Sequence, residues 1–90
     1  MKINEPDFPV LDAPRTDPGR VVVNEYGWLE PHIEETDDWC SMPLRLTITQ
    51  GNGPCIEIGP YTLDGGDIVF LRQAIVEYAR IVESERTLES

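Results

Sequence analysis

The side chains best suited to chemistry or recognition lie between Arg20 and Arg45, a stretch of 24 residues that contains no Lys or Arg. Carboxylates and large aromatic rings are interspersed there: Glu25, Glu30, Glu34, Glu35, Asp37, Asp38, Tyr26, Trp28 and Trp39. Carboxylates without a basic neighbour in the sequence create negative potential, and aromatic rings beside them can anchor a partner protein. The stretch therefore predicts a binding surface.

We expect the partner-binding residues to be Trp28, Glu30, Glu34, Glu35, Asp37, Asp38 and Trp39. In such a site the carboxylates steer a basic protein surface toward the molecule, and an aromatic side chain anchors it. The alternative interpretation places both tryptophans in the core and the charge run in a solvated loop. Exposure of the two tryptophans beside the charges decides between these interpretations.

The same carboxylates are not expected to be catalytic. General acid–base catalysis needs two acids held in fixed geometry with different pKa values, whereas residues 34–38 form a predicted solvated loop. His32 is the single imidazole of the chain. Nothing marks a base and an orienting group for a nucleophile such as Cys40 or Cys55. The sequence therefore predicts no enzyme, no catalytic residue and no cofactor.

Zinc is the metal that these residue types suggest, because thiolate, imidazole and carboxylate groups all bind it. The available ligands are His32, Cys40 and Cys55, with Asp38 as a fourth. They show neither Cys-x-x-Cys nor His-x-x-x-His spacing. We assign no metal ligand, and a small zinc-binding domain is kept as the second alternative function.

The composition indicates one small acidic domain. The chain has 90 residues and a net charge of −10, and the excess is largest in residues 1–38, where ten acids face three bases for a net of −7. This charge argues against direct binding of nucleic acid or of an anionic bilayer. No apolar run has the length of a membrane helix, and residues 1–6 lack a signal-peptide core, so a cytoplasmic location is expected.

Residues 1–19 are predicted to form an extended, proline-rich arm. Pro6, Pro9, Pro14 and Pro18 remove backbone donors and disfavour both a helix and a central strand. Apolar side chains in the segment can dock it onto the domain or onto a partner, and a mobile tail is the alternative. Residues 20–90 are expected to form a single domain.

Strands are predicted from apolar alternation. Residues 20–26 form one strand, and residues 28–33 are expected to return beside it after a bend at Gly27. Residues 43–59 form a hairpin whose loop, centred on Asn52, has residues that accept positive φ.

The apolar faces of the two strands lie on the same side of the hairpin when the numbers of paired residues sum to an even value. A loop centred on Asn52 makes this sum 104. In that register Leu46 faces Ile58 and Ile48 faces Ile56. It also places Cys40 and Cys55 far apart, which disfavours a disulfide between them.

A helix is predicted over residues 67–85, with Asp67 or Asp64 as its N-cap. Nearly half of its circumference is apolar, and this apolar arc comprises Ile68, Phe70, Leu71, Ala74, Ile75, Tyr78, Ala79, Ile81 and Val82. So wide an arc indicates a contact besides one small sheet, supplied by the arm or by a second subunit in a homodimer. The expected fold is thus α+β: a small antiparallel sheet of three or four strands packed by one C-terminal helix.

The basic residues comprise six Arg and one Lys, a usage common in proteins from high-GC genomes. Together with the acidic composition and the absence of catalytic motifs in the sequence, the chain resembles small accessory proteins of bacteriophages that infect high-GC, actinobacterial hosts. The resemblance implies a non-enzymatic protein that binds and modulates a host factor in the host cytoplasm. The first alternative is a DNA-mimic inhibitor of a nucleic-acid-binding protein.

Overall fold

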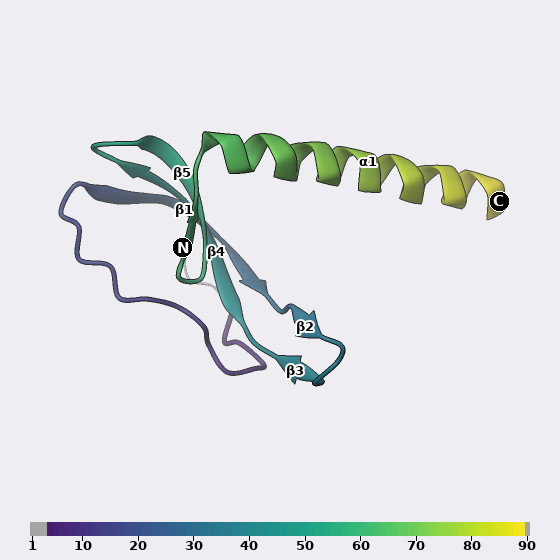
Figure 1. Cartoon of the computed structure of the whole chain (residues 1–90), viewed down its shortest axis with the longest axis horizontal. Helices are drawn as coiled ribbons and strands as arrows, with labels where there is room; N and C mark the ends of the chain where they lie inside the picture. The colour runs from purple at the N-terminus through teal and green to yellow at the C-terminus, as the bar shows by residue number, and fades with distance from the viewer. Residues whose placement is uncertain (1–3, 90) are drawn as a thin grey trace.

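The computed structural model describes residues 4–89, and side chains for residues 4–85. A twisted antiparallel sheet has the strand order β1-β4-β5-β6 and is followed by one helix (Figure 1). The strands of this sheet are β1 (Arg20–Leu29), β4 (Met42–Thr49), β5 (Gly53–Ile58) and β6 (Tyr61–Leu63). A separate two-stranded ribbon pairs β2 (His32–Ile33) with β3 (Asp38–Trp39), and the helix is α1 (Gly65–Glu89). The predicted α+β class, with a four-stranded sheet and a C-terminal helix, is confirmed.

The β4–β5 hairpin has the predicted faces in a different register. Leu44 pairs with Ile58 and Leu46 with Ile56, so the register is displaced by two residues from our prediction, which was wrong. Thr49 pairs with Gly53, whose φ is 71°, and the loop is therefore centred on Gly51 instead of Asn52. A displacement of two residues leaves every side chain on its predicted face, because the side-chain period of a strand is two.

Strand β1 is longer than predicted and contains two irregularities. Its register with β4 shifts between Val22 and Asn24 and again between Glu25 and Gly27. Gly27 has a φ of 147° and lies inside the strand, so the expected bend and returning strand at this position are wrong. A glycine in this conformation accommodates a bulge as readily as a turn, which is why the sequence did not distinguish them.

The sheet has one uncharged face and one polar face. Cross-strand pairing places the following residues on the uncharged face: Val21, Asn24, Gly27, Leu29, Met42, Leu44, Leu46, Ile48, Pro54, Ile56, Ile58, Tyr61 and Leu63. None of these side chains is buried, and Ile48 is 47% exposed. The polar face carries Arg20, Glu25, Arg45, Thr47, Cys55 and Glu57, of which the last three are buried. The most buried part of the sheet is therefore its polar side.

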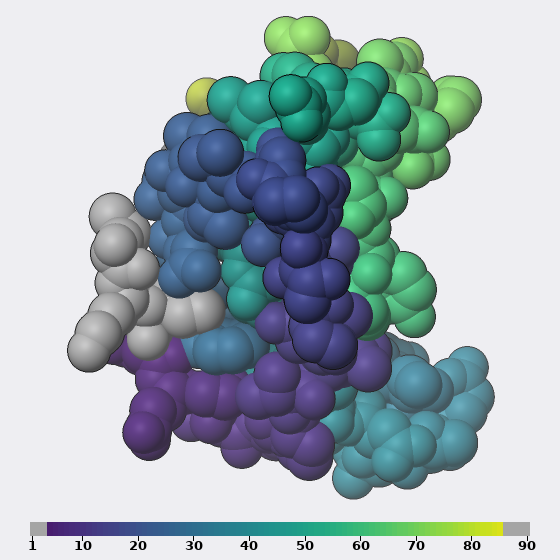
Figure 2. Space-filling view, turned by 90° about the vertical axis from the view of Figure 1, so that its left-hand side faces the viewer, coloured from purple at the N-terminus to yellow at the C-terminus, as the bar shows by residue number. Residues whose placement is uncertain are grey.

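The arm covers this polar face. Leu11 N donates to Ser41 O at 2.9 Å and Ser41 N donates to Pro9 O at 2.9 Å, so the arm runs beside the segment that enters β4. Phe8 N also donates to Ser41 Oγ at 3.2 Å. Figure 2 shows the arm crossing the sheet from the purple end upward. The covering segment thus makes the polar face the interior of the molecule.

Helix α1 begins at a reciprocal cap and leads away from the sheet. Asp64 is the N-cap: its Oδ1 accepts from Asp67 N at 2.9 Å, and Asp67 Oδ2 accepts from Asp64 N at 3.3 Å. The position of the helix differs from our expectation, because its contacts with the sheet are concentrated at β6 and it extends beyond the sheet (Figure 1). Within the described residues, no helix has the length and apolar character needed to span a bilayer.

Candidate partner-binding site

The β2–β3 ribbon carries the predicted acidic residues away from the sheet. His32 pairs with Trp39 and Ile33 with Asp38, and the intervening residues form the turn at the end of the ribbon (Figure 1). Asp37 has a φ of 56°, a left-handed conformation that a short polar residue tolerates. All four carboxylates at this end are exposed, and we call them the acidic tip: Glu34, Glu35, Asp37 and Asp38.

An aromatic stack stands at the base of the acidic tip. Trp39 stacks with His32, with ring centroids 4.1 Å apart, and with Phe8 of the arm at 4.9 Å. The interplanar angles are 16° and 15°. Trp39 nevertheless remains 41% exposed. One tryptophan is therefore held in a fixed orientation beside the charges while part of its surface faces solvent.

The acidic tip has little internal neutralisation. His32 Nε2 lies 2.8 Å from Asp37 Oδ1, which ties one carboxylate to the ribbon. Among the described side chains, residues 4–85, those of Glu34, Glu35 and Asp38 have no hydrogen bond or ion pair. Their charges therefore face solvent.

Trp28 and Glu30, two of the predicted site residues, have a different position. Trp28 is half-buried opposite Pro43 on the polar face, and its indole N–H donates to the carbonyl of Asn4. Glu30 Oε2 accepts from Ser41 Oγ at 3.3 Å. Both side chains hold the arm and the entry to β4, whereas Trp39 and the acidic tip form the exposed surface.

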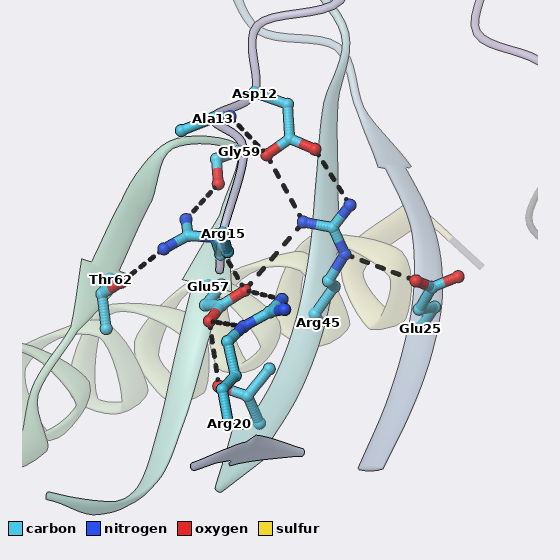
Figure 3. Close-up of polar contacts among 10 residues, drawn as sticks. Asp12, Ala13, Arg15, Arg20, Glu25, Arg45, Glu57, Gly59 and Thr62 are labelled. Atoms are coloured by element: carbon cyan, nitrogen blue, oxygen red, sulfur yellow. Dashed lines mark hydrogen bonds and ion pairs between the residues drawn. The ribbon is translucent and has the colours of Figure 1, made fainter. Parts of the chain in front are cut away.

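Beneath the arm lies an ion network centred on Glu57, whose side chain is 2% exposed (Figure 3). Arg20 donates from Nε to Oε2 at 2.8 Å and from Nη2 to Oε1 at 2.7 Å. Arg15 Nε lies 3.2 Å from Oε1, and Thr47 Oγ1 donates to Oε2 at 3.2 Å. The buried carboxylate thus has charged and neutral partners from the arm, β1 and β4.

Arg45 extends this network along the polar face. Its Nη2 donates to Asp12 Oδ2 at 2.9 Å, and its Nε donates to Glu25 Oε1 at 3.4 Å. The whole network comprises three acids and three bases: Asp12, Glu25, Glu57, Arg15, Arg20 and Arg45. Three of the seven basic residues of the chain are therefore engaged beneath the arm. The acidic tip receives none of them.

The network shifts the pKa values of its members. Burial raises the pKa of Glu57, but the hydrogen bonds from Arg20 and the charges of Arg15 and Arg20 outweigh it, so the pKa lies below the usual value. Burial likewise raises the pKa of Asp12, and the paired Arg45 brings it below the usual value. The hydrogen bond to Asp12 raises the pKa of Arg45 despite burial. These shifts indicate a structural role, because both acids are held ionised.

This network was not predicted from the sequence. One signal was available: in the observed register Arg45 pairs directly with Glu57, and opposite charges are favourable across a strand pair. The contributions of Asp12 and Arg15 had no such signal, since an irregular arm has no register with the sheet.

The candidate zinc ligands lie on different segments of the fold. Cys55 is buried on β5, where its Sγ lies 3.6 Å from Gly53 O, and Cys40 is a half-buried free thiol before β4. Among the side chains that the structure describes, those of residues 4–85, there is no group of three or more His, Cys, Asp or Glu arranged to hold a metal ion. His32 instead contacts Trp39 and Asp37.

Comparison of the chain with protein-family models, with curated proteins and with solved structures gives no match. The geometry of the molecule is therefore the main support for a candidate function. That geometry is a small α+β protein with a projecting acidic ribbon and one partly exposed, stacked tryptophan.

Proposed function

We propose that this protein is a non-enzymatic binding module that recognises a basic surface of a partner protein through the acidic tip and Trp39. One observation carries the proposal: four exposed carboxylates project from the sheet beside a tryptophan that two stacked rings hold in place. Exposed aromatic side chains of this kind are common anchors at the centre of protein interfaces.

The charges and the ring have separate roles in this proposal. Carboxylates at the end of a projecting ribbon raise the rate of encounter with a basic surface, because the attraction extends about 8 Å at physiological ionic strength. Trp39 then supplies short-range binding energy, and its stacking with His32 reduces the conformational entropy lost when it is immobilised. The resemblance to phage accessory proteins supports a host protein as the partner.

The test compares capture of partners by the immobilised wild type and by two immobilised variants that have lost the same number of charges. The site variant carries Glu34→Gln, Glu35→Gln, Asp37→Asn and Asp38→Asn. The control carries Glu5→Gln, Asp7→Asn, Glu77→Gln and Glu85→Gln, which are exposed positions outside the ribbon.

We expect the wild type and the control to capture the same basic protein from a bacterial lysate, and the site variant to lose it. With the purified partner, the association rate constant of the wild type should fall steeply as the salt concentration rises. That of the site variant should change little with salt. Equal association by all three proteins would refute a role for the acidic tip. If duplex DNA competes with this protein for the partner, the acidic tip acts as a DNA mimic. If the partner binds duplex DNA and this protein simultaneously, that mechanism is excluded.

A further inference from the structure

The single chain exposes more surface than a compact protein of its mass. Its accessible area is 7152 Å², whereas a compact monomer of 10.2 kDa exposes about 5,300 Å². Its radius of gyration is 15.8 Å, compared with about 12 Å for a compact 90-residue domain. The excess of about 1,800 Å² falls within the range of about 1,000–2,500 Å² that each chain buries in an extensive homodimer.

Two apolar surfaces of the chain are exposed. The uncharged face has no charged residue among the strand positions paired in the sheet, and Val21, Ile48 and Tyr61 on it are 60%, 47% and 59% exposed. On the apolar arc of α1, Phe70 and Tyr78 are 72% and 70% exposed. Removing large apolar side chains such as these from water is favourable, so both surfaces favour a covered state.

The helix of the same chain is poorly placed to cover the uncharged face. A single residue, Asp64, separates the end of β6 from the start of α1, and its reciprocal cap with Asp67 fixes the direction in which the helix begins. The helix then extends beyond the sheet (Figure 1). Folding it back would require breaking this cap and reversing the chain over one residue.

We propose that a second copy of this chain covers both surfaces: two chains related by a two-fold axis exchange their helices, so that the apolar arc of each α1 lies across the uncharged face of the other chain. Each chain carries both contacting surfaces, the apolar arc and the uncharged face. A two-fold axis therefore covers both surfaces of both chains through two identical contacts. Neither surface contains a charged residue, so no ion is left unpaired in the contact. The acidic tip is not part of this contact.

The first test is the mass of the chain in solution at increasing concentration, measured by sedimentation equilibrium. The wild type should have the mass of two chains at micromolar concentration. Ile75→Glu in the apolar arc and Ile48→Glu on the uncharged face should each raise the dimer dissociation constant by at least about 100-fold. Val76→Glu is the matched control, because Val76 is an exposed neighbour of Ile75 outside the apolar arc, and it should leave the mass unchanged.

Mixing the two disrupted variants tests the exchange itself. In a mixed dimer of Ile48→Glu and Ile75→Glu, both substitutions fall in one of the two contacts and the other contact is unsubstituted. We therefore expect the mixture to dimerise more tightly than either variant alone. Failure of the mixture to exceed its components, or dimerisation of Ile48→Glu at wild-type strength, would overturn the exchange.

A second measurement uses the unsubstituted protein and so does not depend on the folding of any variant. In a mixture of isotope-labelled and unlabelled chains, filtered nuclear Overhauser spectra report contacts between chains only. The exchange predicts intermolecular signals between Ile75 or Tyr78 and Ile48 or Ile56. A monomeric mass, or intermolecular signals confined to helix–helix contacts, would refute it, and neither result bears on partner capture by the acidic tip.

Discussion

Arg20 and Glu57 form a two-point hydrogen-bonded ion pair, with contacts of 2.8 and 2.7 Å, between side chains 37 residues apart. The pair joins β1 to β5 across the intervening strand β4, whose Thr47 also donates to Glu57. Such a planar two-point geometry gives both direction and strength to a buried ion pair. The polar face is therefore held together by charged side chains as well as by the backbone ladder.

Glu57→Gln should lower the free energy of unfolding by about 3 kcal/mol, because it leaves the guanidinium groups of Arg15 and Arg20 without their shared buried carboxylate. Urea denaturation followed by circular dichroism measures the change. The control is Glu77→Gln on the exposed side of α1, which should shift the free energy by less than about 0.5 kcal/mol. If Glu57→Gln lowers the free energy of unfolding no more than the control does, the network does not stabilise the protein.

The stability of the protein should fall in acid. The pKa values of Glu57 and Asp12 lie below their ordinary values of 4.5 and 3.8, so the unfolded chain binds protons more readily than the native protein. Their contribution is therefore complete above those ordinary values, and it is lost as the pH falls through the lower native values. Urea midpoints between pH 7 and pH 3 measure this loss, and Glu57→Gln should flatten the curve. An unchanged slope in that variant would contradict the assignment.

Gly59→Ala should release the arm. Gly59 has a φ of 56°, and an added Cβ would lie 2.5 Å from the carbonyl oxygen of Leu11. The strain and the clash together should cost about 1–3 kcal/mol and raise the hydrogen-exchange rate of the Leu11 amide, which donates to Ser41. Gly51→Ala is the control, since nothing lies within 4 Å of its added Cβ. Equal protection of Leu11 in both variants would show that the arm does not depend on this close approach.

Trp39→Ala should weaken partner binding by about 2 kcal/mol, or roughly 30-fold, if Trp39 is the anchor. Trp28→Phe should leave the affinity nearly unchanged, because Trp28 is half-buried and its indole bonds the Asn4 carbonyl. Surface plasmon resonance with the captured partner measures the affinities of the two variants. A larger loss for Trp28→Phe than for Trp39→Ala would place the anchor on the polar face instead of on the ribbon.

Apolar alternation was sufficient to predict β4 and β5, because Leu44, Leu46 and Ile56 recur at the strand period. It did not fix the register, since pairings displaced by two residues keep the same faces and differ only in the turn at Gly51. Nor could it show which face is covered. Thr47 and Glu57 are buried on the face that the arm crosses, and an irregular proline-rich segment has no period that reveals where it lies.

The candidate site was predictable in part. The absence of Lys and Arg between residues 21 and 44 located the acidic tip, and the structure brings Trp39 to its base. The separation of Trp28 from this surface depends on the length of β1, which the sequence did not give because Gly27 suits a turn and a bulge equally. Phe8 joins the stack through the arm, a long-range contact without a local signal.

The uncharged face and the acidic tip are expected to respond to ionic strength in opposite ways. Added sodium chloride would screen the proposed attraction between the acidic tip and a basic partner, and it would also screen the mutual repulsion of two chains that each carry a net charge of −10. Excluded anions such as sulfate further strengthen the burial of apolar surface. If both proposals hold, low ionic strength favours capture of a partner and high ionic strength favours self-association, so ionic strength selects between two kinds of complex.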